Sequence, residues 1–363
     1  MIYNNIKYCY NDLAIMPAEI SKISHRSECQ IFDENDMLPL FTAPMSCIVN
    51  LKNCKNFFTN GIYSIIPRNI DLNSRIEYCE IGYWSAFSLI EAEDIFIKRD
   101  IKNAITYRIV IDIANGHMQT MFDIANKIKT KYGNKVLIMA GNIANPETYI
   151  EYCKAGIDYV RVGIGSGNGC LTSTQTSIHY PMASLINEIR QYKEEMMISG
   201  QLFDKFKLTK IVADGGVRGY SDIIKALALG ADYVMIGSVF VKMLESASIC
   251  YKKFSDGNKY ELPIDERSEE NIKSLIKNHE LFKEYYGMST KKAQMEIGKV
   301  DLHTSEGTFK IFEVEYTMKT WIDNFSDYLR SAMSYCNCKN LNDFIGKQKL
   351  IPITNNGFNS FNK

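Results

Sequence analysis

A glycine-rich loop carries a cysteine that is placed to act as a nucleophile. Residues 163–172 read GIGSGNGCLT and follow a short apolar run at 158–163. A structural cysteine usually lies on an apolar face of a helix or strand, whereas a loop that follows a strand exposes its thiol to ligands. Loop amides also favour the thiolate, which is the reactive form of the side chain. We therefore predict that Cys170 is a covalent catalytic nucleophile.

Two further glycine turns are typical of a phosphate-binding site. Asp214-Gly215-Gly216 follows the run 210–213, and Gly237-Ser238 ends the run 233–238. Such turns expose backbone N–H groups, and the loops after the seventh and eighth strands of barrels commonly bind phosphate. Asp214 lies at the same edge and can accept hydrogen bonds from ribose hydroxyls, although a helix cap or an Asx turn is the alternative role.

Eight short apolar runs position these loops. Each is followed by a segment of helix length, and several are apolar at nearly every position, as parallel strands buried on both faces require. Eight such units in succession favour a single-domain (β/α)8 TIM barrel spanning 1–363 over an open sheet. The runs are Leu38–Met45, Gly61–Pro67, Gly82–Leu89, Arg108–Ala114, Lys135–Ala140, Asp158–Gly163, Lys210–Ala213 and Tyr233–Ser238.

The pattern weakens after the eighth run. Residues 246–284 are polar and irregular, which indicates a long excursion that serves as a lid or an interface. A last helix around 321–335 is expected to close the barrel. The tail 352–363 is rich in Asn, Gly and Ser and is expected to be flexible.

Composition excludes several classes of protein. The 363 residues carry zero formal net charge, so no basic field indicates nucleic-acid binding. No apolar stretch is long enough for a membrane span, and no signal-peptide pattern begins the chain, so we expect a cytoplasmic protein. Ten cysteines at irregular spacing fit reduced thiols better than a disulfide framework or a zinc site.

Several motifs together resemble the IMP dehydrogenase/GMP reductase family over nearly the whole chain. Each motif is weak alone, but their order and spacing are specific. They are Ala43-Pro44-Met45, the loop 163–172, Ala213-Asp214-Gly215-Gly216-Val217-Arg218, Met235-Ile236-Gly237-Ser238, Tyr286-Gly287-Met288-Ser289 and Ser305-Glu306-Gly307.

The resemblance implies a role for each matching position. Cys170 matches the nucleophile that attacks C2 of the purine, while Thr172 and Glu306 match the pair that handles the proton needed for ammonia to leave. The implied substrate-binding residues are Asn168, Asp214, Gly216, Gly237, Ser238, Tyr285, Gly287, Met288 and Ser289. The implied cofactor is NADPH, with NADH or NAD not excluded, near Asp112, Ala114, Asn115 and Gly116. The resemblance also implies a homotetramer and a monovalent cation such as K⁺ at Gly165, Gly167 and Cys170.

Two features favour the reductase branch of this family. Dehydrogenases carry a regulatory CBS module after the second barrel strand, but Pro67 to Gly82 leaves room for only one helix. They also carry a long flap with an Arg-Tyr pair that activates water, whereas the short flap-like segment 290–304 has no such pair. We expect NADPH-dependent reductive deamination of GMP, or of a related guanine nucleotide, to IMP and ammonia through a thioimidate on Cys170.

Two alternatives remain. One is an IMP dehydrogenase that lacks the CBS module and oxidises IMP to XMP with NAD. The other is a non-catalytic nucleotide-binding homologue. Two positions depart from the family pattern: Asn168 stands where a serine is usual, and Ser46 replaces an aspartate. These departures leave the exact nucleotide open.

Overall fold

The structure is a computed structural model of the chain. It describes residues 5–101, 105–167, 169–199, 209–253, 259–262, 269–287, 289–298, 301–302, 304 and 307–361. Among these residues, no helix is both long and apolar enough to cross a membrane.

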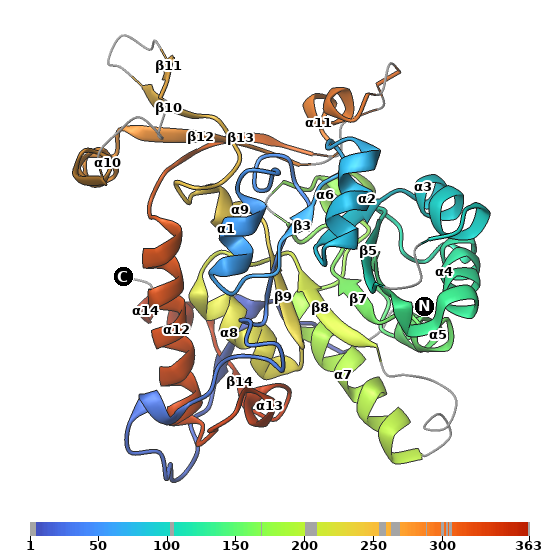
Figure 1. Cartoon of the computed structure of the whole chain (residues 1–363). Helices are drawn as coiled ribbons and strands as arrows, with labels where there is room; N and C mark the ends of the chain where they lie inside the picture. The colour runs from blue at the N-terminus through green and yellow to red at the C-terminus, as the bar shows by residue number, and fades with distance from the viewer. Residues whose placement is uncertain are drawn as a thin grey trace.

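Eight parallel strands form the predicted (β/α)8 barrel (Figure 1). Their order around the sheet is β2-β9-β8-β7-β6-β5-β4-β3. A parallel bridge between Phe41 and Tyr63 brings the two edge strands together, and Tyr63 N donates to Leu40 O at 3.1 Å. The strands are β2 (Leu40–Thr42), β3 (Ile65–Ile66), β4 (Trp84–Phe87), β5 (Tyr107–Asp112), β6 (Val136–Ile143), β7 (Tyr159–Val162), β8 (Lys210–Asp214) and β9 (Tyr233–Ile236).

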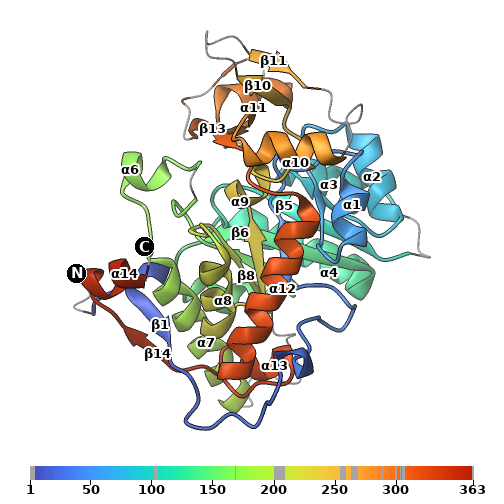
Figure 2. The same cartoon turned by 90° about the vertical axis from the view of Figure 1, so that its left-hand side faces the viewer.

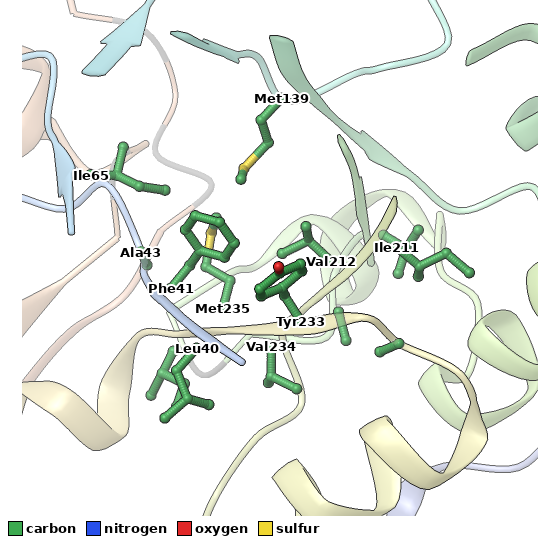
Figure 3. Close-up of a cluster of buried hydrophobic side chains, with 14 of the residues drawn as sticks. Leu40, Phe41, Ala43, Ile65, Met139, Ile211, Val212, Tyr233, Val234 and Met235 are labelled. Carbon is green, nitrogen blue, oxygen red and sulfur yellow. The ribbon is translucent and has the colours of Figure 1, made fainter. Parts of the chain in front are cut away.

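The barrel strands are buried on both faces, as their apolar runs predict. Every residue of β2, β4 and β9 is buried. Figure 3 shows the alternation that a strand imposes: Phe41, Tyr233 and Met235 lie on one side of β2 and β9, and Leu40 and Val234 lie on the other. Inside the barrel, the rings of Phe41 and Tyr233 meet edge-on with centroids 5.2 Å apart.

Helices cover the outside of the barrel, and their ends follow ordinary capping rules. Asp71 caps α2 by accepting from Ser74 N, and Ser88 forms a capping box with Glu91 at the start of α3. The helices between barrel strands are α1 (Cys54–Thr59), α2 (Leu72–Glu80), α3 (Leu89–Glu93), α4 (Gln119–Tyr132), α5 (Thr148–Lys154), α6 (Thr172–Thr176), α7 (Met182–Ser199) and α8 (Tyr220–Leu229). Only α2 separates β3 from β4, which confirms that no CBS module is inserted there.

A second, antiparallel sheet interrupts the eighth unit of the barrel. Its strand order is β11-β10-β12-β13, and Figure 1 shows it above the barrel with helix α10 at one end. The bounds are β10 (Cys250–Lys253), β11 (Lys259–Glu261), α10 (Glu269–Lys277), β12 (Leu281–Tyr286) and β13 (Phe309–Glu313). Most of the irregular excursion expected at 246–284 is therefore regular structure. The inner strand β12 reads LFKEYY. Its buried Lys283 stands at a position where an apolar residue would have completed the apolar–polar alternation typical of a strand.

Short helices flank this sheet, and the last helix completes the barrel. After β9 the chain forms α9 (Ser238–Val241), and the flap-like segment 290–304 begins with α11 (Lys291–Glu296). Helix α12 (Met318–Tyr335) contains the helix expected at 321–335 and packs against α8.

The chain ends also contain regular structure. Strand β1 (Leu13–Ile15) pairs antiparallel with β14 (Leu350–Pro352), as Figure 2 shows. Helix α13 (Leu341–Phe344) precedes β14 in the chain. Helix α14 (Asn355–Phe361) follows, so most of the tail expected to be flexible is helical. Its composition of Asn, Gly and Ser gives no helical periodicity, and the pairing of β14 with a strand some 340 residues away is a tertiary contact.

Candidate active site

A cavity of about 510 Å³ opens at the carboxyl ends of the barrel strands. This is the end at which active sites of such barrels lie. The predicted site residues that line it are Asp112, Ala114, Gly165, Gly167, Cys170, Thr172, Asp214, Gly216, Gly237, Ser238, Tyr285, Gly287 and Ser289. The fold thus brings together residues from strands far apart in the sequence.

Cys170 differs from most other cysteines in its surroundings. It is half-buried, lines the cavity, and its thiol donates to Thr172 Oγ1 at 3.2 Å. Seven of the ten thiols are instead buried, and burial raises the pKa of Cys47 and Cys79 to about 12. A thiol that remains protonated in the core is inert, so the cavity thiol is the one suited to nucleophilic chemistry.

The cysteine loop is held by its own backbone and by the chain next to Glu306. Cys170 N donates to Gly167 O at 3.0 Å, and Ser173 Oγ donates to Gly165 O at 2.9 Å. Thr308 N donates to Gly169 O at 2.9 Å, and Cys170 forms an antiparallel bridge with Gly307. Gly307, the residue that follows Glu306 in the sequence, therefore lies against the cysteine loop.

An ion triad that sequence reasoning missed spans the floor of the cavity. Arg161 on β7 donates through one terminal nitrogen to Asp112 Oδ1 at 2.6 Å and through the other to Asp214 Oδ2 at 2.8 Å. Asn142 Nδ2 donates to the same Asp214 oxygen at 2.8 Å. One buried guanidinium thus fixes two carboxylates from strands β5 and β8. In the sequence, Arg161 was visible only as a charged residue between the apolar Val160 and Val162.

The charge state of this triad follows from its geometry. Burial by itself lowers the pKa of Arg161, but the carboxylates of Asp214 and Asp112 outweigh burial and hold it above its usual value. The guanidinium is therefore a permanent cation. Asp214 Oδ2 accepts from both Arg161 and Asn142, which leaves its other oxygen, Oδ1, for a ligand hydroxyl.

The glycine turns after β8 and β9 lie at another part of the cavity. Gly216 has a φ of +74°, a conformation that glycine adopts readily, and its N–H donates to Ser166 O at 3.0 Å. The Ser166 hydroxyl is buried without a hydrogen-bond partner among the described residues. Gly237 and Ser238 begin α9 and line the same cavity. The turns after β8 and β9 therefore present small residues to the cavity, and the unsatisfied Ser166 hydroxyl belongs to the neighbouring cysteine loop.

The antiparallel sheet covers the cysteine loop at very short range. A Cβ atom on Gly169 would lie 2.7 Å from the Tyr285 hydroxyl, and one on Gly287 would lie 2.7 Å from Gly169 O. Such distances are not tolerated, so both positions require glycine for this packing. Strand β12 and its continuation therefore form a roof over Cys170.

The flap helix α11 is hydrogen-bonded to the barrel through one carboxylate. Glu296 accepts from Ser46 Oγ at 2.6 Å and from the Tyr286 hydroxyl at 2.8 Å. Ser46 follows β2, so this carboxylate joins the flap to the carboxyl end of a barrel strand. On the same segment, Gln294 and Ile297 line the cavity. We refer to Ser46, Tyr286 and Glu296 as the flap clamp.

One side of the cavity carries the residues expected to bind a cofactor. Asp112, Ala114 and Arg68 line this side of the cavity. Arg68 Nη1 donates to the Asp112 carbonyl oxygen at 3.4 Å. The Nε of Arg68 is buried and has no hydrogen-bond partner in the described chain. Asn115 and Gly116 are not among the lining residues. Gly116 uses its N–H with Asn142 O and its carbonyl with the Tyr152 hydroxyl, so its backbone serves packing.

Three predicted site residues, Asn168, Met288 and Glu306, lie outside the described residues. Conversely, the cavity includes Arg68, Asn142, Arg161, Gln294, Ile297 and Thr304, which sequence reasoning did not place in the site. Among the described residues, no cluster of His, Cys, Asp and Glu is arranged to hold a metal ion.

Comparison with known proteins gives a consistent result. The IMP dehydrogenase / GMP reductase domain matches residues 97–361. A GMP reductase of Clostridium acetobutylicum is 28% identical over 364 residues, covering 96% of this chain and 97% of that protein. GMP reductases of Staphylococcus saprophyticus and Staphylococcus aureus strain Newman are 27% and 28% identical, and cover 96% and 92% of this chain.

Proposed function

Because this chain belongs to the IMP dehydrogenase/GMP reductase family, we propose that it is an oxidoreductase that converts GMP, or a closely related guanine nucleotide, to IMP and ammonia. The observation that carries the proposal is the half-buried Cys170 thiol, 3.2 Å from Thr172 Oγ1 at the carboxyl end of the barrel. Relatives named GMP reductase align over almost their whole length, which supports the same substrate class.

In the proposed reaction, Cys170 forms a covalent bond with the purine. The thiolate adds to C2, and the 2-amino group leaves as ammonia once it has gained a proton, which produces a thioimidate. Thr172 is proposed to relay that proton, and Glu306 is proposed to supply it. When bound, the reduced nicotinamide supplies the hydride that C2 receives in place of the amino group. The carbon–sulfur bond then breaks, and Cys170 is released as the thiolate.

The remaining cavity residues bind and orient the nucleotide. Asp214 is proposed to accept from the ribose hydroxyls, because Arg161 and Asn142 hold it in one orientation. Gly216, Gly237 and Ser238, with Asn168, are proposed to bind the phosphate. Tyr285, Gly287, Met288 and Ser289 are proposed to contact the base under the roof of the antiparallel sheet.

We further propose NADPH as the cofactor, on the side of the cavity formed by Asp112, Ala114 and Arg68. The Nε of Arg68 is buried and has no hydrogen-bond partner among the described residues, so it can donate to a polar group of a ligand there. A K⁺ ion at the carbonyls of Gly165, Gly167 and Cys170 is also proposed. The first two of these carbonyls already accept one hydrogen bond each, which leaves each a second lone pair. A homotetramer is proposed from the same resemblance and is testable by light scattering.

One assay tests the reaction against its alternatives. Purified protein is incubated with GMP or dGMP and NADPH or NADH, and with IMP and NAD, while reduced-cofactor absorbance and ammonia are followed. Ammonia released in step with NADPH oxidation supports the proposal. Reduction of NAD with IMP would identify a dehydrogenase instead, and turnover in none of the mixtures would favour a non-catalytic homologue. Glu306→Gln is expected to slow ammonia release by about 10²–10⁴-fold while leaving nucleotide affinity similar.

A further inference from the structure

A second cavity, of about 590 Å³, opens at the opposite, amino-terminal end of the barrel strands. Its lining includes Trp84, Tyr159 and Lys210, which are the first residues of β4, β7 and β8, and Arg108, the second residue of β5. We call it the amino-terminal cavity. Its volume lies within the roughly 300–1,000 Å³ typical of small-molecule sites. It exceeds that of the candidate active site, and none of the proposed chemistry uses it.

The walls of this cavity are aromatic. Trp84, which is 3% exposed, meets the half-buried Tyr159 edge-on with ring centroids 5.1 Å apart, and Tyr63 and Tyr83 also line the cavity. Beneath them, Phe41 packs edge-on against both Trp84 and Tyr159 and is 1% exposed. The inner end of the cavity is therefore backed by tightly packed rings. Flat aromatic faces of this kind suit a planar heterocycle.

The charges of the cavity favour an anion. Lys210 is paired with Glu34 at 2.6 Å, and Asp158 is paired with Lys129 at 2.9 Å. Arg108 has no carboxylate partner in the part of the chain that the structure describes. Its Nη1 donates to the Gly82 carbonyl oxygen at 3.1 Å. A guanidinium remains charged in proteins, and its fork matches a phosphate. Among the cations of the lining, Arg108 is thus the one that no described carboxylate neutralises, and it shares the lining with the aromatic rings.

We propose that the amino-terminal cavity is a second nucleotide-binding site, in which a base packs against Tyr159, with the buried Trp84 behind it, and a phosphate binds Arg108. A purely apolar ligand would leave Arg108 unpaired, and a cation would be repelled by it. Only a ligand with both a planar ring and an anionic group uses both features of the lining.

The location gives this site a structural route to the active site. Arg108 and Asp112 lie on β5, Tyr159 and Arg161 on β7, and Lys210 and Asp214 on β8. The three strands that begin at the amino-terminal cavity therefore carry the ion triad that orients the substrate ribose in the proposed function. We expect occupancy to change the KM for the substrate, and this regulatory part rests on the proposed function.

Tryptophan fluorescence provides a local test, because the chain has only two tryptophans and Trp321, on α12, does not line this cavity. The protein is titrated with AMP, GMP, ATP and GTP, and with adenosine and inorganic phosphate as single-component probes. The expected result is saturable quenching by at least one nucleotide, weaker with adenosine or phosphate alone, and lost in Trp84→Phe. Quenching that persists in Trp84→Phe would overturn the proposal, as would no quenching by any nucleotide.

Two charge variants with opposite expected effects sharpen the test. Arg108→Gln is expected to weaken nucleotide binding about tenfold or more, because a charge-assisted phosphate contact is lost. Glu34→Gln is expected to tighten it, because Lys210 is released from its ion pair. Circular dichroism verifies that both variants fold. Unchanged affinity in a folded Arg108→Gln would contradict the proposed site.

The fluorescence test requires no turnover, so it separates this site from the proposed function. If quenching is found and GMP is not turned over, the binding proposal stands and the proposed function fails. If both are found, a quenching nucleotide other than the substrate should change the KM in the parent protein and not in Arg108→Gln. An equal change in both proteins would overturn the regulatory part.

Discussion

The barrel and the antiparallel sheet contribute to one cavity by different physical means. The barrel side chains are fixed by buried charge pairing: Arg161 is 7% exposed and bonds two carboxylates. The sheet and its flap contribute through close backbone packing and through the flap clamp of Glu296 with Ser46 and Tyr286. Burial makes the first arrangement rigid, whereas the second depends on a few contacts at its edge. We infer that the barrel preorganises the site and that the sheet encloses it.

The largest expected effect concerns Cys170, the proposed nucleophile on the barrel. Cys170→Ala should lower the turnover of GMP by at least about 10⁴-fold, because no covalent intermediate can form. Steady-state kinetics and mass spectrometry of trapped adducts measure this. Cys9→Ala, which removes an exposed thiol, is the matched control and should retain the parental rate. Near-parental turnover in Cys170→Ala would remove the nucleophile from the proposed mechanism.

The next effect tests the preorganisation of the barrel. Arg161→Met should lower the free energy of unfolding by about 3–5 kcal/mol, because the carboxylates of Asp112 and Asp214 lose their buried partner. Urea unfolding measures the loss. Arg190→Met, which removes a more exposed pair with Glu194 on one helix, should cost less than about 1 kcal/mol. Equal losses in the two variants would show that the ion triad does not stabilise the barrel.

A smaller effect is expected at the flap clamp. Glu296→Ala should raise the KM for GMP by about 5–20-fold, the value of one or two lost hydrogen bonds, while the midpoint of thermal unfolding changes little. Lys291→Ala on the same helix is the control, because its side chain is exposed. A matching rise in KM for Lys291→Ala would mean that any change in α11 has this effect. A fall in kcat with constant KM would place Glu296 in the chemistry instead.

A further effect, confined to stability, is a pH dependence within the inserted sheet. Lys283 is 1% exposed, its ammonium donates to the Leu244 and Ser246 carbonyls, and burial lowers its pKa to about 8. Between pH 8 and the ordinary value of 10.5 the unfolded chain binds the extra proton, so folding becomes relatively more favourable as the pH rises. The cost of burying the charge is fully present below about pH 8, declines as the pH rises, and is gone above pH 10.5.

Comparison with Lys283→Met isolates this contribution. The stability of the parent relative to the variant should increase between about pH 8 and pH 10.5, by on the order of 3 kcal/mol at most. Urea unfolding of both proteins at several pH values measures the difference, which also cancels the titration of buried tyrosines and cysteines. A difference that stays constant with pH would mean that Lys283 is not shifted by burial.

The sequence by itself determined the barrel and most of the site. Parallel strands buried on both faces must be apolar, so their runs are visible, and the glycine turns at their ends mark the active edge. Cys170 and Asp214 were found in this way and Thr172 through the family resemblance, and all three line one cavity. The inserted sheet was not found, because its central strand buries a lysine and its partner β13 is largely exposed.

Only the tertiary structure decided which distant groups meet. Arg161 stands in the sequence as one charge within an apolar run, and nothing local indicates that it bonds both Asp112 and Asp214. The Glu296 carboxylate likewise meets Ser46 across 250 residues. Local periodicity records which face of a strand or helix is buried, whereas such pairings depend on how separate elements are placed in space. The glycine loop that made Cys170 a candidate is therefore visible in the local sequence, whereas the antiparallel sheet that covers this loop is visible only in the tertiary structure.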